Sequence, residues 1–209
     1  HMEIRDDDNY LWTLPMFHCN GWGHTYAITG TGGTHVCQRT FDAADCFRRV
    51  REYDISFMCG APTVLNALIQ HYQDNDGDVV TLGDRDLRIA TAGSAPATAT
   101  IETVEDDFGW RIIHIYGLTE TAPIITTSNS PRRLAERGRS LKIKQGAETL
   151  CTDLRVVDED GEGVPRDGET LGEVVVRGNQ VMDRYLNKPE ITEEAFSDRI
   201  EGYFHTGDL

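Results

Sequence analysis

Short apolar runs rich in β-branched residues alternate with amphipathic stretches from Tyr10 to Ile115. The stretches begin with helix-start residues, such as Asp42 as an N-cap and Pro62 in a first turn. Alternating strands and helices favour a mainly parallel sheet, so we expect an α/β fold in which helices layer on that sheet. The expected strands are 10–14, 34–38, 55–59, 87–92 and 111–115, and the expected helices are one through 26–28 and those at 43–53, 62–72 and 97–108.

The pattern changes after about Ser130. Strand-like runs are now separated by Asp-Gly turn signals, which is typical of antiparallel pairing. We expect residues 1–130 to form an α/β subdomain and residues 131–209 a small β-rich subdomain. The remaining expectations are an acidic loop at 74–86, a polar linker or surface loop at 130–138, paired strands at 153–158 and 172–177, a short helix at 189–196 and a last strand at 200–205.

The formal net charge of −15 disfavours nucleic acids and anionic membrane surfaces as partners. Lysine makes up only three of the 20 basic residues. An acidic, lysine-poor surface resembles proteins of salt-loving organisms; a GC-rich genome would also favour arginine, but it explains the acid excess less well. No apolar run approaches the ~20 residues of a membrane helix. Five scattered cysteines, mostly within apolar segments, indicate buried thiols in the cytoplasm and not a disulfide framework.

The segment Tyr116–Pro123 places an aromatic ring, a glycine, a hydroxyl and a carboxylate directly after an expected strand. Such a segment can stack a ring on a base, approach a ligand at Gly117, and present Thr119 to phosphate and Glu120 to Mg²⁺. Gly93 follows the preceding expected strand, and ligands of parallel sheets lie beyond the carboxyl ends of the strands. The pattern favours a shared site at these ends, although a strand running into a polar loop would have the same composition.

This segment resembles the signature of the adenylate-forming (AMP-binding) superfamily, which includes acyl-CoA synthetases, firefly luciferase and the adenylation domains of peptide synthetases. Four other segments match in the family's order: Leu14–Trp22, Thr91–Pro96, Gly172–Gly178 and Tyr203–Asp208. The first is similar to the fatty acyl-CoA synthetase version of a motif at the acyl site. The resemblance covers nearly the whole chain from about Asn9 and implies an α/β core followed by a barrel-like β subdomain.

The resemblance also implies roles for single residues. In the nucleotide site, Tyr116 would stack on adenine, Asp208 would accept hydrogen bonds from both ribose hydroxyls, Thr119 would contact the α-phosphate and Glu120 would hold ATP-bound Mg²⁺. Other nucleotide contacts would come from Gly93, Ser94, Ala95, His114 and Gly117. The acyl site would be lined by His18, Trp22, Gly93 and Gly117, and the catalytic residues would be Thr119, Glu120 and His18. Without the resemblance, His18 would be interpreted as a packed core histidine, Thr119 as a helix cap and Asp208 as solvated surface. For Tyr116 the alternative is a packed core aromatic, which the following Gly117 disfavours.

The implied reaction is AMP-forming ligation of a medium- or long-chain fatty acid to CoA by a cytoplasmic enzyme, with ATP and Mg²⁺, in which an acyl-AMP precedes the thioester. A homodimer is compatible with the family. The family's phosphate-loop lysine and C-terminal-domain lysine have no match, because Lys142, Lys144 and Lys188 lie in other contexts. We therefore expect an inactive central fragment of a ligase, whether its truncation is natural or engineered. The alternative is a naturally truncated, non-catalytic module that binds nucleotide or acyl groups.

Overall fold

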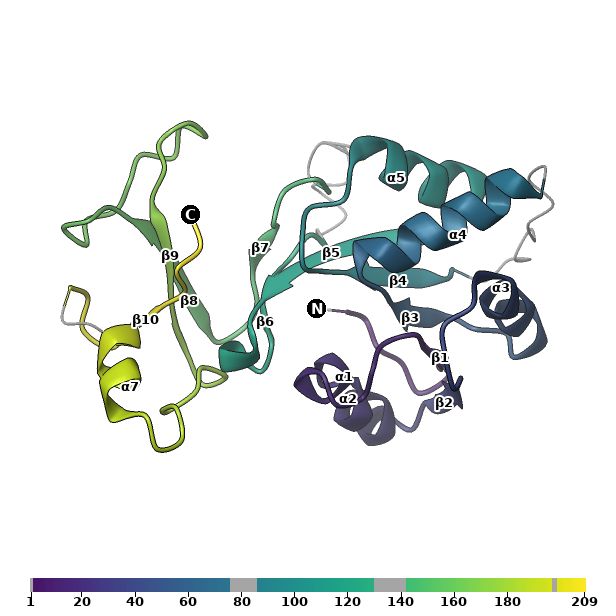
Figure 1. Cartoon of the computed structure of the whole chain (residues 1–209), viewed down its shortest axis with the longest axis horizontal. Helices are drawn as coiled ribbons and strands as arrows, with labels where there is room; N and C mark the ends of the chain where they lie inside the picture. The colour runs from purple at the N-terminus through teal and green to yellow at the C-terminus, as the bar shows by residue number, and fades with distance from the viewer. Residues whose placement is uncertain (1, 76–85, 130–141, 197–198) are drawn as a thin grey trace. The chain divides into compact units, whose positions relative to one another are not determined.

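The computed structural model describes residues 2–75, 86–129, 142–196 and 199–209. The chain divides into two compact units (Figure 1). Unit 1 comprises residues 1–116 and 126–147, and unit 2 comprises residues 117–125 and 148–209. The boundary expected between residues 130 and 131 falls in a stretch outside the described residues and stays a prediction, as do the linker at 130–138 and most of the acidic loop at 74–86.

The larger sheet has seven strands in the order β2-β1-β3-β4-β5-β6-β7 (Figure 1). From β2 through β5, neighbouring strands in this order pair in parallel, which confirms the expected α/β architecture. Strand β5 extends two residues beyond its expected end and includes Tyr116 and Gly117, and β6 and β7 were not expected. The bounds are Asn9–Trp12 (β1), Thr34–Cys37 (β2), Phe57–Cys59 (β3), Arg88–Thr91 (β4), Arg111–Gly117 (β5), Ile124–Thr127 (β6) and Ala147–Glu148 (β7).

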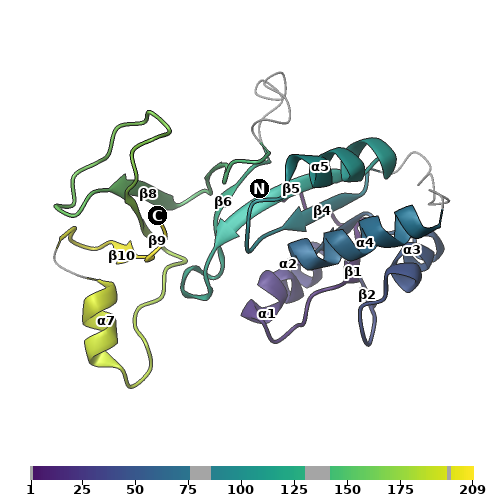
Figure 2. The same ribbon diagram turned by 45° about the horizontal axis from the view of Figure 1, so that its top comes forward.

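The four expected helices of this region are present, and three of them, α3, α4 and α5, lie side by side on one side of the sheet (Figures 1 and 2). Helix α3 begins where expected because the carboxylate of Asp42 accepts a hydrogen bond from the Asp45 N–H at 2.8 Å. The bounds are Cys19–Trp22 (α1), His24–Thr31 (α2), Ala43–Glu52 (α3), Pro62–Asp74 (α4) and Thr98–Glu102 (α5), which continues as a π-helical turn at Thr103–Asp107 (η1).

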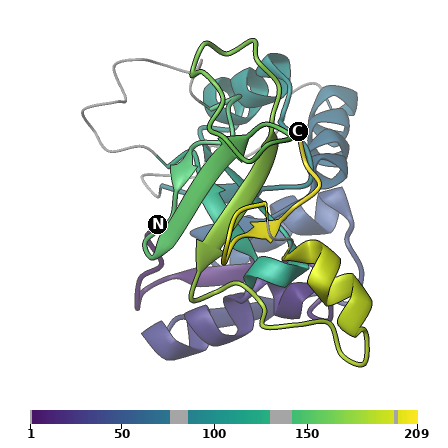
Figure 3. The ribbon, with the colours of Figure 1, turned by 90° about the vertical axis from the view of Figure 1, so that its left-hand side faces the viewer.

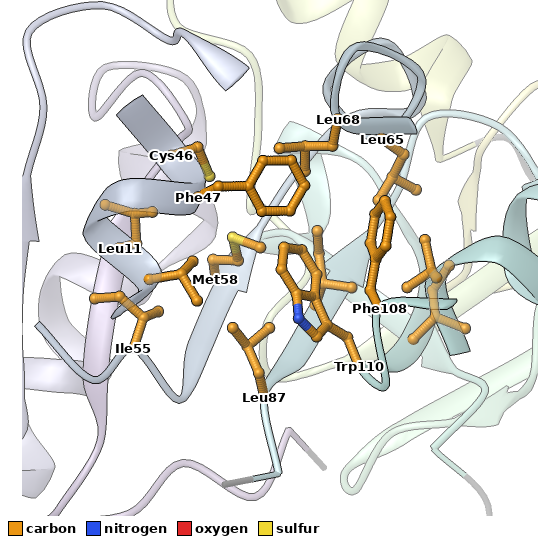
Figure 4. Packing of buried hydrophobic residues seen from close by; sticks show 14 of the residues in the cluster. Leu11, Cys46, Phe47, Ile55, Met58, Leu65, Leu68, Leu87, Phe108 and Trp110 are labelled. Atoms are coloured by element: carbon orange, nitrogen blue, oxygen red, sulfur yellow. The ribbon is translucent and has the colours of Figure 1, made fainter. Parts of the chain in front are cut away.

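The main hydrophobic core lies between these three helices and the sheet (Figure 4). Alternation along β1 sends Leu11 into this core, whereas Tyr10 stacks on His24 of α2 with ring centroids 5.2 Å apart. Helices therefore cover both faces of the sheet, as a parallel sheet requires. The labelled core side chains come from β1, α3, β3, α4 and the segments that flank β3, β4 and β5: Leu11, Cys46, Phe47, Ile55, Met58, Leu65, Leu68, Leu87, Phe108 and Trp110.

A buried ion pair joins the N-terminal segment of unit 1 to β4. The Arg88 guanidinium contacts the Asp8 carboxylate, and their side chains are 0% and 1% exposed. Asp8 also accepts hydrogen bonds from the Ser56 hydroxyl at 2.6 Å and the Arg5 N–H at 2.7 Å. Burial disfavours the charged carboxylate, but the hydrogen bonds from Arg88, Ser56 and Arg5 outweigh burial and lower the pKa of Asp8.

Unit 2 contains a three-stranded antiparallel sheet in the order β10-β9-β8, so the expected pairing of its two long strands is confirmed (Figure 3). Val157, Val175 and Tyr203 form its core. The last strand is shorter than expected, because residues 200–203 form a turn closed by a hydrogen bond from Tyr203 N–H to Ile200 O. The bounds are Thr152–Val157 (β8), Glu173–Gly178 (β9), Pro189–Ala195 (α7) and Phe204–His205 (β10).

None of the five cysteines, all of which the structure describes, forms a disulfide, but only Cys46 and Cys59 are buried. Cys37 and Cys151 are exposed, so the prediction of buried thiols was wrong for them. Cys37 ends an outer strand, β2, at a position facing solvent, which an apolar neighbourhood in the sequence does not reveal. No helix within the described ranges combines the length and apolarity that crossing a membrane requires.

Candidate functional site

Two segments expected to contact a base leave the same edge of the sheet in unit 1. Strands β4 and β5 are parallel neighbours, with Thr91 paired to His114; Gly93 follows β4, and Tyr116 lies near the end of β5. Gly93 has a φ of +98°, a conformation that glycine adopts without a side-chain clash. Residues 93–95 are exposed, and Tyr116 is half-buried. An exposed backbone beside an aromatic ring can bind the edge and the face of a flat heterocycle.

His114 lies within β5 and is buried. Its Nδ1 is 3.2 Å from the Lys144 carbonyl oxygen, and its backbone N–H donates to the Ser128 hydroxyl at 2.8 Å. Burial lowers the pKa of His114, and the Lys144 carbonyl opposes that effect only in part. Because a carbonyl only accepts, Nδ1 carries the hydrogen, which leaves Nε2 as the ring nitrogen available as an acceptor. A contact from this ring to adenine stays a prediction.

The turn after β5, residues Leu118–Pro123, belongs to unit 2 and closes on itself. Thr121 lies at its centre: its hydroxyl accepts from the Leu118 N–H at 3.1 Å and lies 2.8 Å from the Pro123 carbonyl oxygen. A Cβ on Gly117 would overlap that oxygen and lie 3.0 Å from the Ile124 Cα. The sequence analysis assigned Gly117 to a close approach by a ligand. The structure shows that the chain itself passes so close to this position, at Pro123, that glycine is required there.

This turn presents the hydroxyl and carboxylate that the sequence singled out. Thr119 is exposed and Glu120 is half-buried in a short 3₁₀ turn, Thr119–Thr121 (η2). Two hydrogen bonds within unit 2 fix Glu120: the Met182 N–H donates to its carbonyl oxygen and the Tyr185 hydroxyl to its Oε1, both at 2.7 Å. Burial, and then the bond to Glu120, raise the pKa of Tyr185 to about 12.

Glu120 fits a magnesium site in which the protein provides one carboxylate and the nucleotide and water provide the other ligands. The described part of the chain contains no cluster of three or more His, Cys, Asp or Glu side chains that could hold a metal ion. Proteins usually hold Mg²⁺ through one or two carboxylates together with substrate phosphates and water, so one fixed carboxylate is sufficient. The donor set therefore agrees with a metal that arrives with a nucleotide.

Asp208 lies in a segment of unit 2 that runs beside the start of β9. Its N–H donates to the Thr206 hydroxyl at 3.1 Å, its carbonyl accepts from the Val174 N–H at 2.9 Å, and the residue is exposed. Its backbone is thus held on both sides while the residue faces solvent. A carboxylate in this setting can accept two hydrogen bonds from neighbouring hydroxyls.

Glu173, at the start of β9, has three hydrogen-bond donors around its carboxylate. Oε2 accepts from His205 Nδ1 at 2.9 Å and Arg199 Nη2 at 3.1 Å, and Oε1 accepts from the Gly207 N–H at 3.2 Å. Partial burial disfavours the charge, but these bonds and the nearby positive charges lower the pKa of Glu173. Glu173 and Tyr185 were absent from the predicted site. Their partners are far away in the sequence, 34 and 65 residues respectively, so no local spacing reveals them.

The acyl motif of unit 1 contains a left-handed turn. All five residues from Cys19 to Gly23 have positive φ, between 47° and 76°. Left-handed backbone costs an L-residue roughly 1–2 kcal/mol, so the surrounding structure must hold this turn. Trp12 packs so tightly on Gly21 that a Cβ there would lie 2.6 Å from a ring carbon, and Nδ1 of the buried His24 is 3.1 Å from the Gly21 carbonyl oxygen.

The two acyl-site residues expected from this motif flank or form the turn. His18 immediately precedes it and is exposed, so it is not the packed core histidine that composition alone would indicate. Trp22 is part of it and is half-buried. The core histidine is instead His24, where burial lowers the pKa to about 4 and keeps the ring neutral at physiological pH.

Comparisons with known proteins identify the family of the chain. The family model described as "AMP-binding enzyme" matches residues 1–186. The chain is 43% identical over 206 residues to the probable peroxisomal acyl-activating enzyme 5 of Arabidopsis thaliana, with 96% of this chain and 36% of that protein covered. It is 39% identical over 207 residues to 2-methylpropanoate–CoA ligase CCL4 of Humulus lupulus, with 96% and 35% covered.

Among solved structures, the N-terminal domain of FACL13 from Mycobacterium tuberculosis, crystallised with an inhibitor, superimposes with a TM-score of 0.79 at 26% identity. That match covers 98% of this chain and 48% of that one. The chain thus spans about a third of the length of the curated relatives. A family model that matches most of the chain, relatives above 35% identity and a shared fold lead to one conclusion: the chain belongs to the AMP-binding family of adenylate-forming enzymes, whose members here are acyl-activating enzymes and CoA ligases.

Proposed function

We propose that this chain is the nucleotide- and acyl-binding part of an ATP-dependent carboxylic acid–CoA ligase. The observation that carries the proposal is the turn Leu118–Pro123, which presents an exposed hydroxyl and a fixed carboxylate directly after β5. In the proposed reaction, a carboxylate oxygen of the acid attacks the α-phosphorus of ATP and pyrophosphate leaves. The thiol of CoA then attacks the acyl carbon and releases AMP.

The family resemblance gives each predicted site residue a role in the proposed reaction. Tyr116 would stack on adenine, with Gly93, Ser94, Ala95 and His114 along the base. Thr119 would donate to the α-phosphate, Glu120 would hold the metal and Asp208 would bind the ribose hydroxyls. Bound Mg²⁺ would neutralise phosphate charge so that the anionic acid can approach. Glu120 is prepared for this role because Tyr185 and Met182 already fix it, so it reorganises little when the metal arrives.

The acid binds, in this proposal, against His18, Trp22, Gly93 and Gly117. A medium- or long-chain fatty acid is the substrate predicted from the sequence, and it stays a prediction. The hop relative is named for 2-methylpropanoate, a short branched acid, so a substrate panel must run from short and branched acids to long chains. A cytoplasmic location also stays a prediction, since the Arabidopsis relative is named as peroxisomal.

Nucleotide binding tests the proposal. We expect the chain to bind adenosine and AMP weakly, and Asp208→Ala to lose roughly 1.5–3 kcal/mol of that binding, tenfold or more in Kd, because a carboxylate bonded to hydroxyls is removed. Titration calorimetry measures both. Asp160→Ala, which removes an exposed carboxylate elsewhere in unit 2, is the control and should bind as the wild type does. AMP binding unchanged by Asp208→Ala would refute the ribose assignment, and no binding of any adenine ligand would refute the proposed function.

A turnover measurement is a one-sided test. Turnover would show that the chain is catalytic, whereas its absence fits both a ligase fragment and a non-catalytic binding module. We expect the isolated chain to release no pyrophosphate with any acid, because its three lysines, Lys142, Lys144 and Lys188, do not match the two lysines that the family uses against developing phosphate charge. Acid-dependent pyrophosphate release above a protein-free control would contradict this expectation. The length of the parent reading frame then distinguishes a fragment from a naturally short module.

A further inference from the structure

Glu173 is linked to the segment that carries Asp208 by more than one contact. Its Oε1 accepts the N–H of Gly207, the residue directly before Asp208. Its Oε2 accepts from the ring of His205, which begins the segment. Gly207 has a φ of +74°, so the chain turns at this residue to bring its N–H toward Glu173. One carboxylate thus holds both ends of the three residues His205–Gly207.

Backbone contacts complete this arrangement. The Thr206 hydroxyl donates to the Val174 carbonyl at 2.7 Å, and the Val174 N–H donates to the Asp208 carbonyl at 2.9 Å. Glu173 and Val174 are neighbours at the start of β9, so both sets of contacts attach the segment to the same strand end. Glu173 and Val174 therefore together hold the backbone that leads to Asp208.

The three partners of Glu173 differ in their exposure to water. The Arg199 side chain is 44% exposed, and ion pairs at such positions contribute at most about 1 kcal/mol. The Glu173 side chain is only 16% exposed and the His205 side chain 5%, so this carboxylate has lost most of its contact with water. A partly desolvated carboxylate bonded to the N–H beside an exposed aspartate can fix the backbone from which that aspartate extends.

We propose that Glu173 is a positioning residue for the ribose-binding carboxylate of Asp208. The inference rests on the proposed function, in which Asp208 binds the two ribose hydroxyls. Accepting from two hydroxyls at once requires the carboxylate to be placed within about 0.5 Å and 10–20° of the productive geometry. Glu173 provides this placement through Gly207 and His205 and does not itself contact the nucleoside.

The test compares adenosine with 2′,3′-dideoxyadenosine, which lacks both hydroxyls, by titration calorimetry on the 209-residue chain. In the wild type we expect adenosine to bind tighter by roughly tenfold or more. Glu173→Ala should bring the ratio of the two Kd values toward one while leaving dideoxyadenosine binding nearly unchanged. Asp208→Ala should do the same, and the double variant should lose no more than either single variant. Glu173→Gln keeps an acceptor oxygen, so its ratio of the two Kd values should lie between those of the wild type and Glu173→Ala.

Asp153→Ala is the matched control, because Asp153 also accepts from an arginine and a second side chain in unit 2, Arg177 and the Tyr203 hydroxyl. It should keep the wild-type ratio, and circular dichroism confirms that each variant is folded. A wild-type ratio in a folded Glu173→Ala or Glu173→Gln overturns the inference and leaves the proposed function standing. Equal wild-type binding of both nucleosides overturns the role of Asp208 and the inference together. Absence of adenosine binding overturns the proposed function itself, and the inference falls with it.

Discussion

Replacing Asp8 with alanine should lower the free energy of unfolding by about 3–5 kcal/mol, because the Arg88 guanidinium would remain buried without its charged partner. Arg88 is fully buried, and Asp8 is its ion-pair partner at the base of β4. The measurement is denaturant unfolding followed by circular dichroism. Replacing both residues, Asp8→Ala with Arg88→Met, should cost less than Asp8→Ala alone, since no unpaired charge is then left inside.

An exposed ion pair provides the control for this experiment. Arg48 and Glu52 pair on the surface of α3, with side chains 49% and 48% exposed. Glu52→Ala should cost less than about 1 kcal/mol. Equal losses in Asp8→Ala and Glu52→Ala would contradict the importance assigned to the buried pair.

The Asp8–Arg88 pair also predicts that the free energy of unfolding decreases at acid pH. The folded-state pKa of Asp8 lies below its unperturbed value of 3.8. Its stabilising contribution is therefore fully present above that value and is lost as the pH falls through the folded-state pKa. The wild type should lose its advantage over the Asp8→Ala, Arg88→Met double variant as the pH falls through this range.

Replacing Gly117 with alanine should cost about 3 kcal/mol of unfolding free energy, at the upper end of the range for overpacking. The added Cβ would overlap the Pro123 carbonyl oxygen, a backbone atom that cannot move aside by a change of rotamer. Relief of the clash requires the turn to open, which would break the hydrogen bonds of Thr121. AMP binding should fall with it. Denaturant unfolding and titration calorimetry measure the two effects.

Gly163→Ala is the matched control within unit 2. A Cβ at Gly163 would meet no atom within 4 Å, and its φ lies outside the positive range. This variant should be as stable as the wild type within about 1 kcal/mol, since alanine also restricts the unfolded chain. If Gly117→Ala were as well tolerated as Gly163→Ala, the turn would be looser than its geometry indicates.

Much of the fold could be predicted from the sequence, because local rules decide it. The N-cap at Asp42 and the proline of α4 determine where two helices begin, and apolar periodicity identifies the parallel strands. The strands β6 and β7 were missed because they are short: β6 has only two isoleucines followed by two threonines, and β7 has only an alanine and a glutamate. The left-handed turn at Cys19–Gly23 was also missed. Its asparagine and two glycines accept positive φ readily, but its cysteine and tryptophan do not, and tertiary packing by Trp12 and His24 holds it.

The candidate site shows the same division between local and long-range information. Motif residues such as Thr119, Glu120 and Asp208 could be named as candidates from the motifs and their resemblance to the family. The residues that orient them could not, because Tyr185 reaches Glu120 across 65 positions and Glu173 reaches Gly207 across 34. These contacts depend on strand register in unit 2 and on the path of the loop before α7. Which distant tyrosine or glutamate contacts a motif segment can be identified only when the fold is known.

The two units also limit how this protein can be divided. The chain passes from one unit to the other at residues 116/117, 125/126 and 147/148, so neither unit is a single uninterrupted length of sequence. A gene fragment that begins at residue 148 encodes Tyr185 and Asp208 but lacks Glu120, and one that stops at residue 147 encodes Glu120 without either of them. Recombination or domain shuffling at 125/126 or 147/148 would therefore separate the carboxylate from the tyrosine that fixes it, and at 116/117 it would separate both from Tyr116. The two units have to be inherited, and replaced, together.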